Sequence, residues 1–418
     1  MKKQIESKGT SPAITRRSVL GGSATLAAAN LLTGQASASS RTSLARPVLV
    51  QVFMRQGMDG CTMVVPHGDD NYYNLRPDYS VPPPGEVNGA LDLDGFFGLA
   101  PSAAGFLTPY SDGRLLFVHA SGSHDPTRSH FEAFARMEVA DPGLPLGAVS
   151  TGWITRFLHA VTPGTGALRG IGANSLLPLS LRGAPKTLPI PDFESFAFPG
   201  RVQTAAARQA AIGEAYSYRP APLGTAALDS IAAFGLGGVD FAAYVPANGA
   251  VYPANDLGRR MKAVAALIKA DIGVETFNVD VEGWDLHANI GVISGGMARL
   301  LDGLSKAVEA FYLDMAAYVD EYVLLGITEF GRHMRQNASA GFDHGHGSCL
   351  FVMGGNVNGG QVWADWPGTH ADDLDNGDLA ITLDYRDVVA EILKKRMGVV
   401  DLTTILPFYT YTDHGFLT

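Results

Sequence analysis

The chain has 418 residues, of which 46% are hydrophobic and 17% charged, so it can form one large soluble domain or two smaller ones with an ample core. A net charge of -10 and the absence of a basic block argue against nucleic acid as a partner. Two cysteines, Cys61 and Cys349, are too few for a disulfide framework and match no zinc-finger spacing, although a single bridge between them stays open.

The N-terminus has the pattern of an export signal. Arg16-Arg17, a weakly apolar stretch at 21–32 and small residues at 36–38 follow one another in the order of a cleavable signal. The paired arginines resemble a twin-arginine (Tat) signal, which implies the Tat export machinery as a partner. We expect residues 1–38 to be removed and residues 39–418 to be periplasmic or secreted as a single domain, with no stable membrane span. A generic secretion signal and a membrane anchor are the alternatives.

The first half of the chain predicts two strands and a helix near candidate functional groups. Residues 47–54 form an apolar strand that leads to Asp59, and residues 114–120 form a second strand. A helix should begin after Ser129, with Glu132 completing a capping box. Ser129 is therefore either a plain helix cap or a hydroxyl nucleophile at a helix N-terminus.

The middle of the chain reads as an insertion or cap, at about 160–258, that carries specificity. It is rich in Gly, Pro and Ser, with strand-like pieces at 176–181, an alanine-rich helix at 205–216 and irregular structure over 218–258.

The second half alternates helices with strands. The expected helices cover 260–270, 297–319 and 388–397, and the expected strands cover 274–280, 323–327 and 349–353. This alternation predicts a three-layer α/β/α fold with a mainly parallel central sheet.

Four strand ends carry carboxylate or imidazole side chains, which are the ligands of zinc, manganese or iron(II). We expect one or two divalent ions there, with Zn or Mn preferred, and arginines that bind an anionic substrate. A turn in which Asp and His cap each other is the alternative. The candidate ligands are Asp59, Asp285, His287, Glu329, Asp343, His344 and His346, and the candidate arginines are Arg332, Arg128 and Arg55.

Several motifs, spread over most of the chain, resemble the DUF1501 family of exported bacterial proteins, whose function is uncharacterised. DUF1501 is in turn similar to the alkaline phosphatase and sulfatase superfamily, so the resemblance implies an alkaline-phosphatase-like fold. The matching stretches are VFMRQGMDG (52–60), SHF (129–131), TGW (151–153), GWDLH (283–287), TEFGR (328–332), DHG (343–345) and DYR (384–386).

The superfamily resemblance also implies roles for individual residues. It gives Asp59 as the first metal ligand, Ser129 as the nucleophile, and Asp285 with His287 as ligands of one metal. Glu329 falls where the superfamily has the Asp of an Asp-His pair, and Phe330 stands in place of its His, which could reduce two metals to one. Asp343, His344 and His346 lie where a late His is expected. A sulfatase of the usual kind is disfavoured, because the Cys-x-Pro-x-Arg signature is absent.

The function expected from these features is that of an exported metal-dependent hydrolase of phosphate or sulfate esters. Ser129 or a metal-activated water would attack a small or polymeric anionic ester, while Arg332 or Arg128 steadies the developing charge. The alternative is a non-catalytic protein of the cell envelope that keeps the fold and serves in binding or assembly. A hydrolase of carbohydrates or carboxylic esters is a weaker reading, because no Gly-x-Ser-x-Gly elbow is present.

Overall fold

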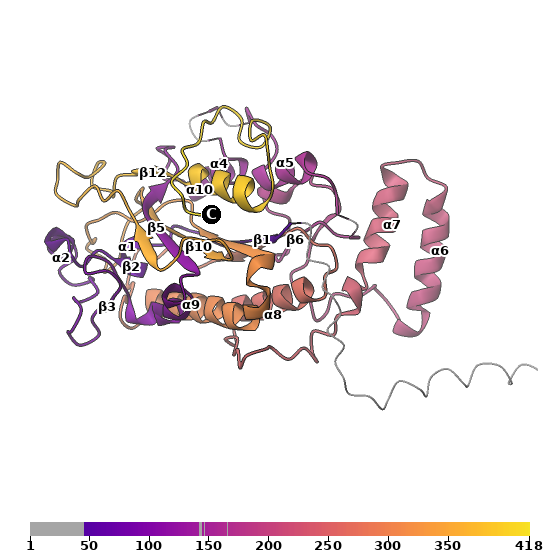
Figure 1. Ribbon diagram of the computed structural model, residues 1–418, viewed down its shortest axis with the longest axis horizontal. Helices are drawn as coiled ribbons and strands as arrows, with labels where there is room; N and C mark the ends of the chain where they lie inside the picture. The colour runs from indigo at the N-terminus through magenta and orange to yellow at the C-terminus, as the bar shows by residue number, and fades with distance from the viewer. Residues whose placement is uncertain (1–45, 142–143, 146, 165) are drawn as a thin grey trace, which may run out of the picture. The chain divides into compact units, whose positions relative to one another are not determined.

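The computed structural model describes residues 46–418 apart from 142–143, 146 and 165, so the predicted export signal at 1–38 lies outside the described residues. The described residues form one compact unit. Its central sheet is mainly parallel and has helices on both faces (Figure 1), which confirms the coarse α/β fold. In the described part of the chain, no helix is both long enough and apolar enough to cross a membrane.

The central sheet has nine strands in the order β11-β5-β10-β9-β1-β8-β6-β7, with β12 also paired to β5. A small second sheet, β2-β4-β3, packs beside it. The strands are β1 (Val48–Met54), β2 (Val64–Val65), β3 (Leu91–Asp92), β4 (Gly98–Leu99), β5 (Leu115–Gly122), β6 (Gly170–Gly172), β7 (Thr187–Pro189), β8 (Thr276–Val281), β9 (Tyr322–Ile327), β10 (Ser348–Gly354), β11 (Gln361–Trp363) and β12 (Leu383–Asp384).

Strand β10 runs against both of its neighbours, β9 and β5, whereas the other described pairs in the central sheet are parallel. A parallel neighbour would need a crossover connection, usually a helix, and the segment from β9 to β10 contains none. As a result β10 begins at the sheet edge where β1, β8 and β9 end. The residues just before β10 therefore reach the same edge as the loops that follow those three strands.

Alternate side chains of β1 enter two separate cores. Val48, Val50 and Val52 pack with the helices on one face, while Leu49 and Phe53 pack with those on the other. The side chains of a strand point alternately to opposite faces, so a strand that is apolar at every position except Gln51 suits a place covered on both sides. The fully buried pattern of β1 is the physical basis of the layered fold.

The helices α8 and α9 cover one face of the sheet, and α4, α5 and α10 cover the other (Figure 1). The helices are α1 (Gly60–Met63), α2 (Asp70–Leu75), α3 (Leu107–Ser111), α4 (His130–Val139), α5 (Trp153–Ala160), α6 (Ala205–Ser217), α7 (Leu223–Ala233), α8 (Asp256–Lys269), α9 (Gly296–Asp314) and α10 (Tyr385–Glu391), which continues as a π-helix over Ile392–Arg396.

Three local predictions differ from the structure. Residues 176–181 form a short 3-10 helix at Leu179–Leu181 rather than a strand, because a short apolar run does not by itself distinguish the two. Helix α7 lies in the stretch expected to be irregular, where Pro222 marks its start rather than a loop. The helix expected over 297–319 ends at Asp314 and gives way to a 3-10 helix at Ala316–Glu321.

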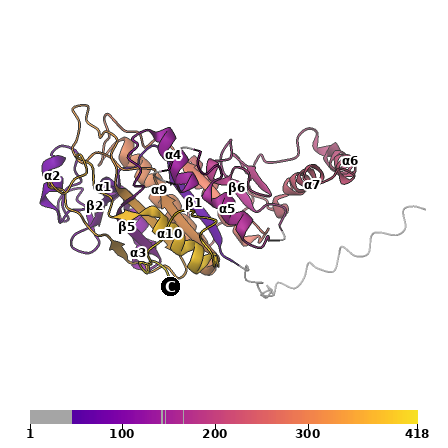
Figure 2. The ribbon, with the colours of Figure 1, turned by 90° about the horizontal axis from the view of Figure 1, so that it is seen from above.

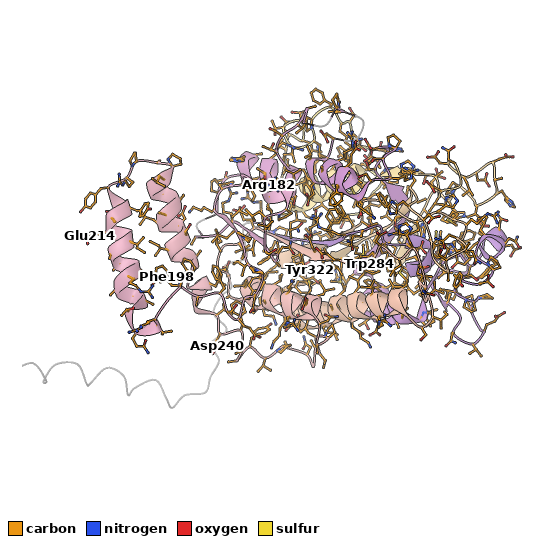
Figure 3. The ribbon with its side chains drawn as sticks, turned by 180° about the vertical axis from the view of Figure 1, so that it is seen from behind. Arg182, Phe198, Glu214, Asp240, Trp284 and Tyr322 are labelled. Carbon is orange, nitrogen blue, oxygen red and sulfur yellow. The ribbon has the colours of Figure 1, made fainter. Side chains whose placement is uncertain are left out.

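Helices α6 and α7 pack on each other as a hairpin that stands off from the sheet layers (Figures 1 and 2). Helix α6 has no buried residue, so its contacts do not extend into a core. Glu214 on α6 is well separated from Trp284, which follows β8 beside the central sheet (Figure 3). The hairpin is therefore remote from the strand ends that carry the candidate ligands.

The two cysteines are buried and are not joined by a disulfide bond. Burial raises the pKa of the Cys61 thiol to about 12 and also raises the pKa of Cys349. Both side chains therefore stay protonated at neutral pH and pack as small apolar groups. The bridge that the sequence left open is not formed.

Candidate metal site

The loops that follow β1, β8 and β9 meet at one edge of the sheet and hold one another in place. The amide of Gln56 donates a hydrogen bond to Glu329 Oε1 at 2.8 Å, and the amide of Gly283 donates to Gln56 Oε1 at 2.7 Å. Gln56 has a φ of 84°, in the left-handed region, so the chain turns sharply as it leaves β1. Side chains from three distant parts of the sequence are thus brought to a common point.

The Asp285 carboxylate is the centre of the site. Its Oδ1 atom lies 2.9 Å from His287 Nε2, 3.2 Å from His344 Nε2 and 3.3 Å from His130 Nε2. His130, Asp285 and His344 form a group whose potential ligand atoms all lie within 4.8 Å of one another. Three imidazole nitrogens and one carboxylate oxygen therefore converge on a small volume.

The other nitrogen of each imidazole, Nδ1, faces an atom that can only accept a hydrogen bond from it at neutral pH. In a neutral ring, a proton on Nδ1 satisfies this acceptor and leaves an unshared electron pair on Nε2. Metal-binding histidines are oriented in this way in proteins. The three acceptors are the Glu329 carboxylate for His130 at 2.7 Å, the Arg128 carbonyl for His344 at 2.7 Å and the Asp343 carboxylate for His287 at 3.1 Å.

These electron pairs need a positive charge between them. The Nε2 atoms of His287 and His344 are only 2.9 Å apart, and without a shared proton or a cation they repel each other. The Nε2 atom of His130 is buried and makes no hydrogen bond, although it lies 3.3 Å from Asp285. An unpaired buried nitrogen that faces a carboxylate and two more imidazoles fits a divalent cation as the missing partner.

The pKa shifts of Asp285 and His344 favour metal binding at neutral pH, whereas that of His130 opposes it. Burial opposes ionisation of Asp285, but hydrogen bonding and charge from Arg332 outweigh it and lower the pKa of Asp285 to about 2. Burial lowers the pKa of His344, which keeps that ring neutral. Burial also acts to lower the pKa of His130, but its hydrogen bond to Glu329 prevails and the pKa is raised. Asp285 is thus ionised and His344 neutral, as metal ligands must be.

Arg332 ties the loops together instead of facing outward. Its side chain is 1% exposed, and its guanidinium donates to the Gly57 carbonyl at 2.6 Å, the Trp284 carbonyl at 2.9 Å and Asp285 Oδ1 at 3.0 Å. It also donates to the carbonyl of Gln56. Arg332 was expected to bind an anionic substrate, but its guanidinium already donates to these four groups within the protein.

Three other candidate residues lie outside the cluster. Asp59 is held by Arg76, whose Nη1 and Nη2 atoms approach its two carboxylate oxygens at 2.6 and 3.1 Å. His346 makes hydrogen bonds to Asp375 at 2.9 Å and to a main-chain carbonyl at 3.1 Å, so both of its nitrogens are engaged. The Arg128 guanidinium pairs with Asp378, and only the Arg128 carbonyl contacts the cluster.

Ser129 precedes helix α4 as its N-cap, as expected, but its side chain makes no cap hydrogen bond. Glu132 does not complete a capping box and instead pairs with Arg136 at 2.9 Å. Ser129 is exposed and stands one residue before His130. The Ser129 hydroxyl thus does not make the capping hydrogen bond that the sequence predicted.

His130 is the ligand candidate that sequence reasoning missed. It is the first residue of α4, and its ring stacks on Phe330, with ring centroids 4.8 Å apart. The ring of Phe330 also lies 5.1 Å from the His344 ring. The sequence signal for His130 is its position at a predicted helix start, directly after Ser129. Phe330 thus packs between the rings of two candidate ligands.

Comparison with known proteins gives a family but no activity. The model of a family described as "Protein of unknown function (DUF1501)" matches residues 203–406, which include Asp285 and His344 but not His130. No curated protein matches the chain. Two solved structures, "Crystal structure of Ps i-CgsB" and its complex with k-i-k-neocarrahexaose, are 9% identical in sequence, with TM-scores of 0.38 and 0.36. Each alignment covers 88% of this chain and 75% of the other, and at this level it supports no argument about activity.

Proposed function

Because this chain belongs to the DUF1501 family, whose description assigns no activity, we propose from its own residues that it is an exported, metal-dependent hydrolase of phosphate or sulfate esters. The observation that carries the proposal is the convergence of three imidazole Nε2 atoms on Asp285, each with its Nδ1 proton fixed by an acceptor. The proposed export rests on the Arg16-Arg17 pattern, and the proposed location is the periplasm or the exterior of the cell.

The ligands of the proposed metal are His130, Asp285 and His344, with His287 as a fourth. An imidazole and carboxylate set of this kind suits zinc or manganese. Such an ion polarises an ester oxygen and lowers the pKa of a bound water. One ion is favoured over two, because Asp59 is paired with Arg76 and His346 with Asp375.

The surrounding residues orient the ligands. Glu329 is buried and accepts a hydrogen bond from His130 Nδ1. Arg332 keeps Asp285 ionised and fixed in position. Ser129 is the proposed nucleophile, because its hydroxyl is exposed at the start of α4 and makes no cap bond. The Arg128 side chain, 30% exposed, is the better placed of the two expected arginines to meet a negatively charged oxygen.

An alkaline-phosphatase-like arrangement is part of the same proposal. A mainly parallel sheet with helices on both faces supports it, as do candidate ligands in the loop after β8 and just before β10. This chain would differ from an alkaline-phosphatase-like site in one proposed ligand, His130, which lies at the start of a helix and packs on Phe330.

Metal analysis combined with ester turnover tests the proposal. Purified protein should contain about one zinc or manganese ion per chain, and chelation should abolish hydrolysis of an aryl phosphate or aryl sulfate. His344→Ala should lose both the metal and the activity, whereas His159→Ala, which changes an exposed His on α5, should lose neither. Full turnover by the chelated protein would refute the proposal.

A non-catalytic binding or assembly protein is the second candidate. The fully engaged guanidinium of Arg332 favours it, because an anionic substrate would find no free arginine at the centre of the cluster. An Asp285→Ala, His287→Ala double variant that retains full biological activity in the cell would support this alternative. Loss of that activity in a folded double variant would count against it.

A further inference from the structure

A groove of about 1000 Å³ lies beside the candidate metal site, and we name it the α4–α8 groove after two of the elements that line it. Its walls come from α4, the segment 174–182, the start of α8 and the end of β8. This volume is at the upper end of the range for small-ligand pockets. A simple phosphate or sulfate monoester would fill only a small part of it.

The groove and the metal site share two elements. His130 and Phe131 are neighbours at the start of α4, and while the His130 ring meets Asp285, Phe131 is 86% exposed and lines the groove. Glu282 lines the groove just after the end of β8, three residues before Asp285. The groove and the candidate metal site are therefore linked through the first turn of α4 and the loop after β8.

The lining alternates between groups that bind hydroxyls and groups that cover apolar surface. Arg182 and Arg260 supply donors, Glu282 supplies acceptors, and Phe131 and Leu176 expose apolar faces, Leu176 at 77%. A sugar ring presents the complementary surface, with hydroxyls at its rim and C–H groups on its faces.

Two donors of the groove lining have no partner in the described part of the chain. The Nδ2 atom of Asn174 and the Nε atom of Arg260 are both buried without a hydrogen bond. The Nη1 atom of Arg260 donates to the main-chain carbonyl of Asp280 at 3.0 Å, which fixes the guanidinium against the wall. Because both atoms are buried, they belong to the interior of the groove wall and not to the surface that a ligand would contact.

The charges of the groove select against two other occupants. Glu138, Asp256, Asp280 and Glu282 line it together with four arginines, so a nucleic acid would meet carboxylates along its phosphate backbone. The same ionised groups disfavour a lipid chain, which needs a dry apolar lining. A ligand rich in neutral hydroxyls tolerates both signs of charge.

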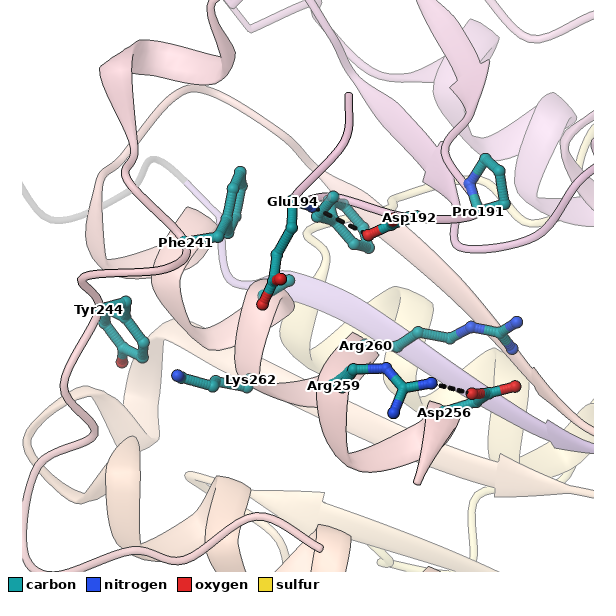
Figure 4. Close-up of a pocket in the computed structure, with 11 residues that line it drawn as sticks. Pro191, Asp192, Glu194, Phe241, Tyr244, Asp256, Arg259, Arg260 and Lys262 are labelled. Atoms are coloured by element: carbon teal, nitrogen blue, oxygen red, sulfur yellow. Dashed lines mark hydrogen bonds and ion pairs between the residues drawn. The ribbon is translucent and has the colours of Figure 1, made fainter. Parts of the chain in front are cut away.

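The lining continues beyond the groove. A neighbouring pocket of about 370 Å³ shares Asp256, Arg259 and Arg260 with it. Figure 4 shows these α8 side chains on one side of the pocket and Asp192 and Glu194 on the other. The two hollows therefore lie next to each other along α8.

We propose that the α4–α8 groove binds an oligosaccharide of several units, and that this oligosaccharide carries the ester presented to the metal site. The ester part rests on the function proposed above, whereas the contact with the sugar chain stands on the groove alone. Phe131 packs on a sugar face, and Arg182 with Arg260 binds hydroxyl oxygens.

Direct binding to a glycan array tests the proposal without turnover. The probes are neutral, sulfated and phosphorylated oligosaccharides of graded length, with single-stranded DNA and unrelated peptides on the same surface. We expect binding to ester-bearing oligosaccharides, stronger for longer chains, and an affinity about tenfold or more lower for Phe131→Ala when calorimetry measures the best ligand. Phe408→Ala is the matched control, because Phe408 is also 86% exposed but does not line the groove.

Each outcome decides one of the two proposals. Absence of glycan binding, preference for DNA or peptides, or equal affinity of folded Phe131→Ala and wild type would overturn the groove proposal. An Arg260→Ala variant gives a second measurement should Phe131→Ala fail to fold. Glycan binding without hydrolysis of any aryl ester would overturn the hydrolase proposal but keep the groove proposal. Hydrolysis of an aryl ester without glycan binding would keep the hydrolase proposal and overturn the groove proposal.

Discussion

Replacing Glu329 by Gln isolates the negative charge that faces His130. Glu329 Oε1 accepts from His130 Nδ1 at 2.7 Å, and the Glu329 side chain has no exposed surface. The substitution keeps the shape of the side chain and an oxygen that can accept from His130 Nδ1, but it removes the charge, so the hydrogen bond weakens and His130 loses a source of its basicity. Loss of such an outer partner lowers metal affinity by about 10- to 100-fold, or about 1.4 to 2.8 kcal/mol.

Zinc titration in competition with a chelating dye measures this loss. Glu132→Gln is the matched control, because Glu132 lies on the helix that His130 begins but its carboxylate pairs with Arg136. A thermal melt of each variant shows whether the fold is kept, since Glu329 is buried. Unchanged zinc affinity in a folded Glu329→Gln protein would refute the assignment of His130 as a metal ligand.

Three further predictions follow from the same geometry. Arg76→Ala leaves the Asp59 carboxylate buried and unpaired, so chemical denaturation should show a loss of about 3 to 5 kcal/mol of stability, while the metal content of the folded fraction stays the same. The pKa of His130 is raised in the metal-free protein, so protons compete with zinc for this ring at a higher pH than for an ordinary imidazole. Zinc affinity should therefore begin to fall at that higher pH when the pH is lowered. A midpoint of the affinity loss below the ordinary pKa of imidazole would contradict this. Ser129→Ala should lose aryl ester hydrolysis but keep the metal, and retention of full activity would leave Ser129 as a helix cap alone.

The layered fold was accessible from sequence because it follows from local patterns. The apolar run of β1, broken only by Gln51, predicts a strand buried on both faces, and the 3.6-residue period of α8 predicts one buried stripe. The direction of β10 was not accessible in this way. A strand's direction depends on how the preceding loop crosses the sheet edge, and the loop between residues 328 and 347 contains no regular element that reveals it.

The candidate site was only partly predictable for a similar reason. Asp285, His287 and His344 lie next to the ends of apolar strands, and this position predicted them as ligands. Asp59 also lies at a strand end, but it forms an ion pair with Arg76, which lies 17 residues further on at the end of α2. Ion pairs of this kind depend on tertiary packing, which residue spacing does not encode.

His130 shows the converse case, since a tertiary contact adds a ligand candidate that spacing does not. Its Nε2 reaches Asp285 only because α4 packs its first turn against Phe330 and the loop after β9. A single His at a predicted helix start has many possible neighbours. A search for ligands at strand ends therefore does not include it.

The central claim is that His130, Asp285 and His344 hold one divalent metal ion, and anomalous diffraction at a metal absorption edge tests it most directly. Crystals of protein prepared with zinc or manganese should show one strong peak at about 2.0 to 2.2 Å from the imidazole Nε2 atoms and the Asp285 carboxylate. A site empty of anomalous signal, or a peak located at Asp59 or His346 instead, would contradict the account.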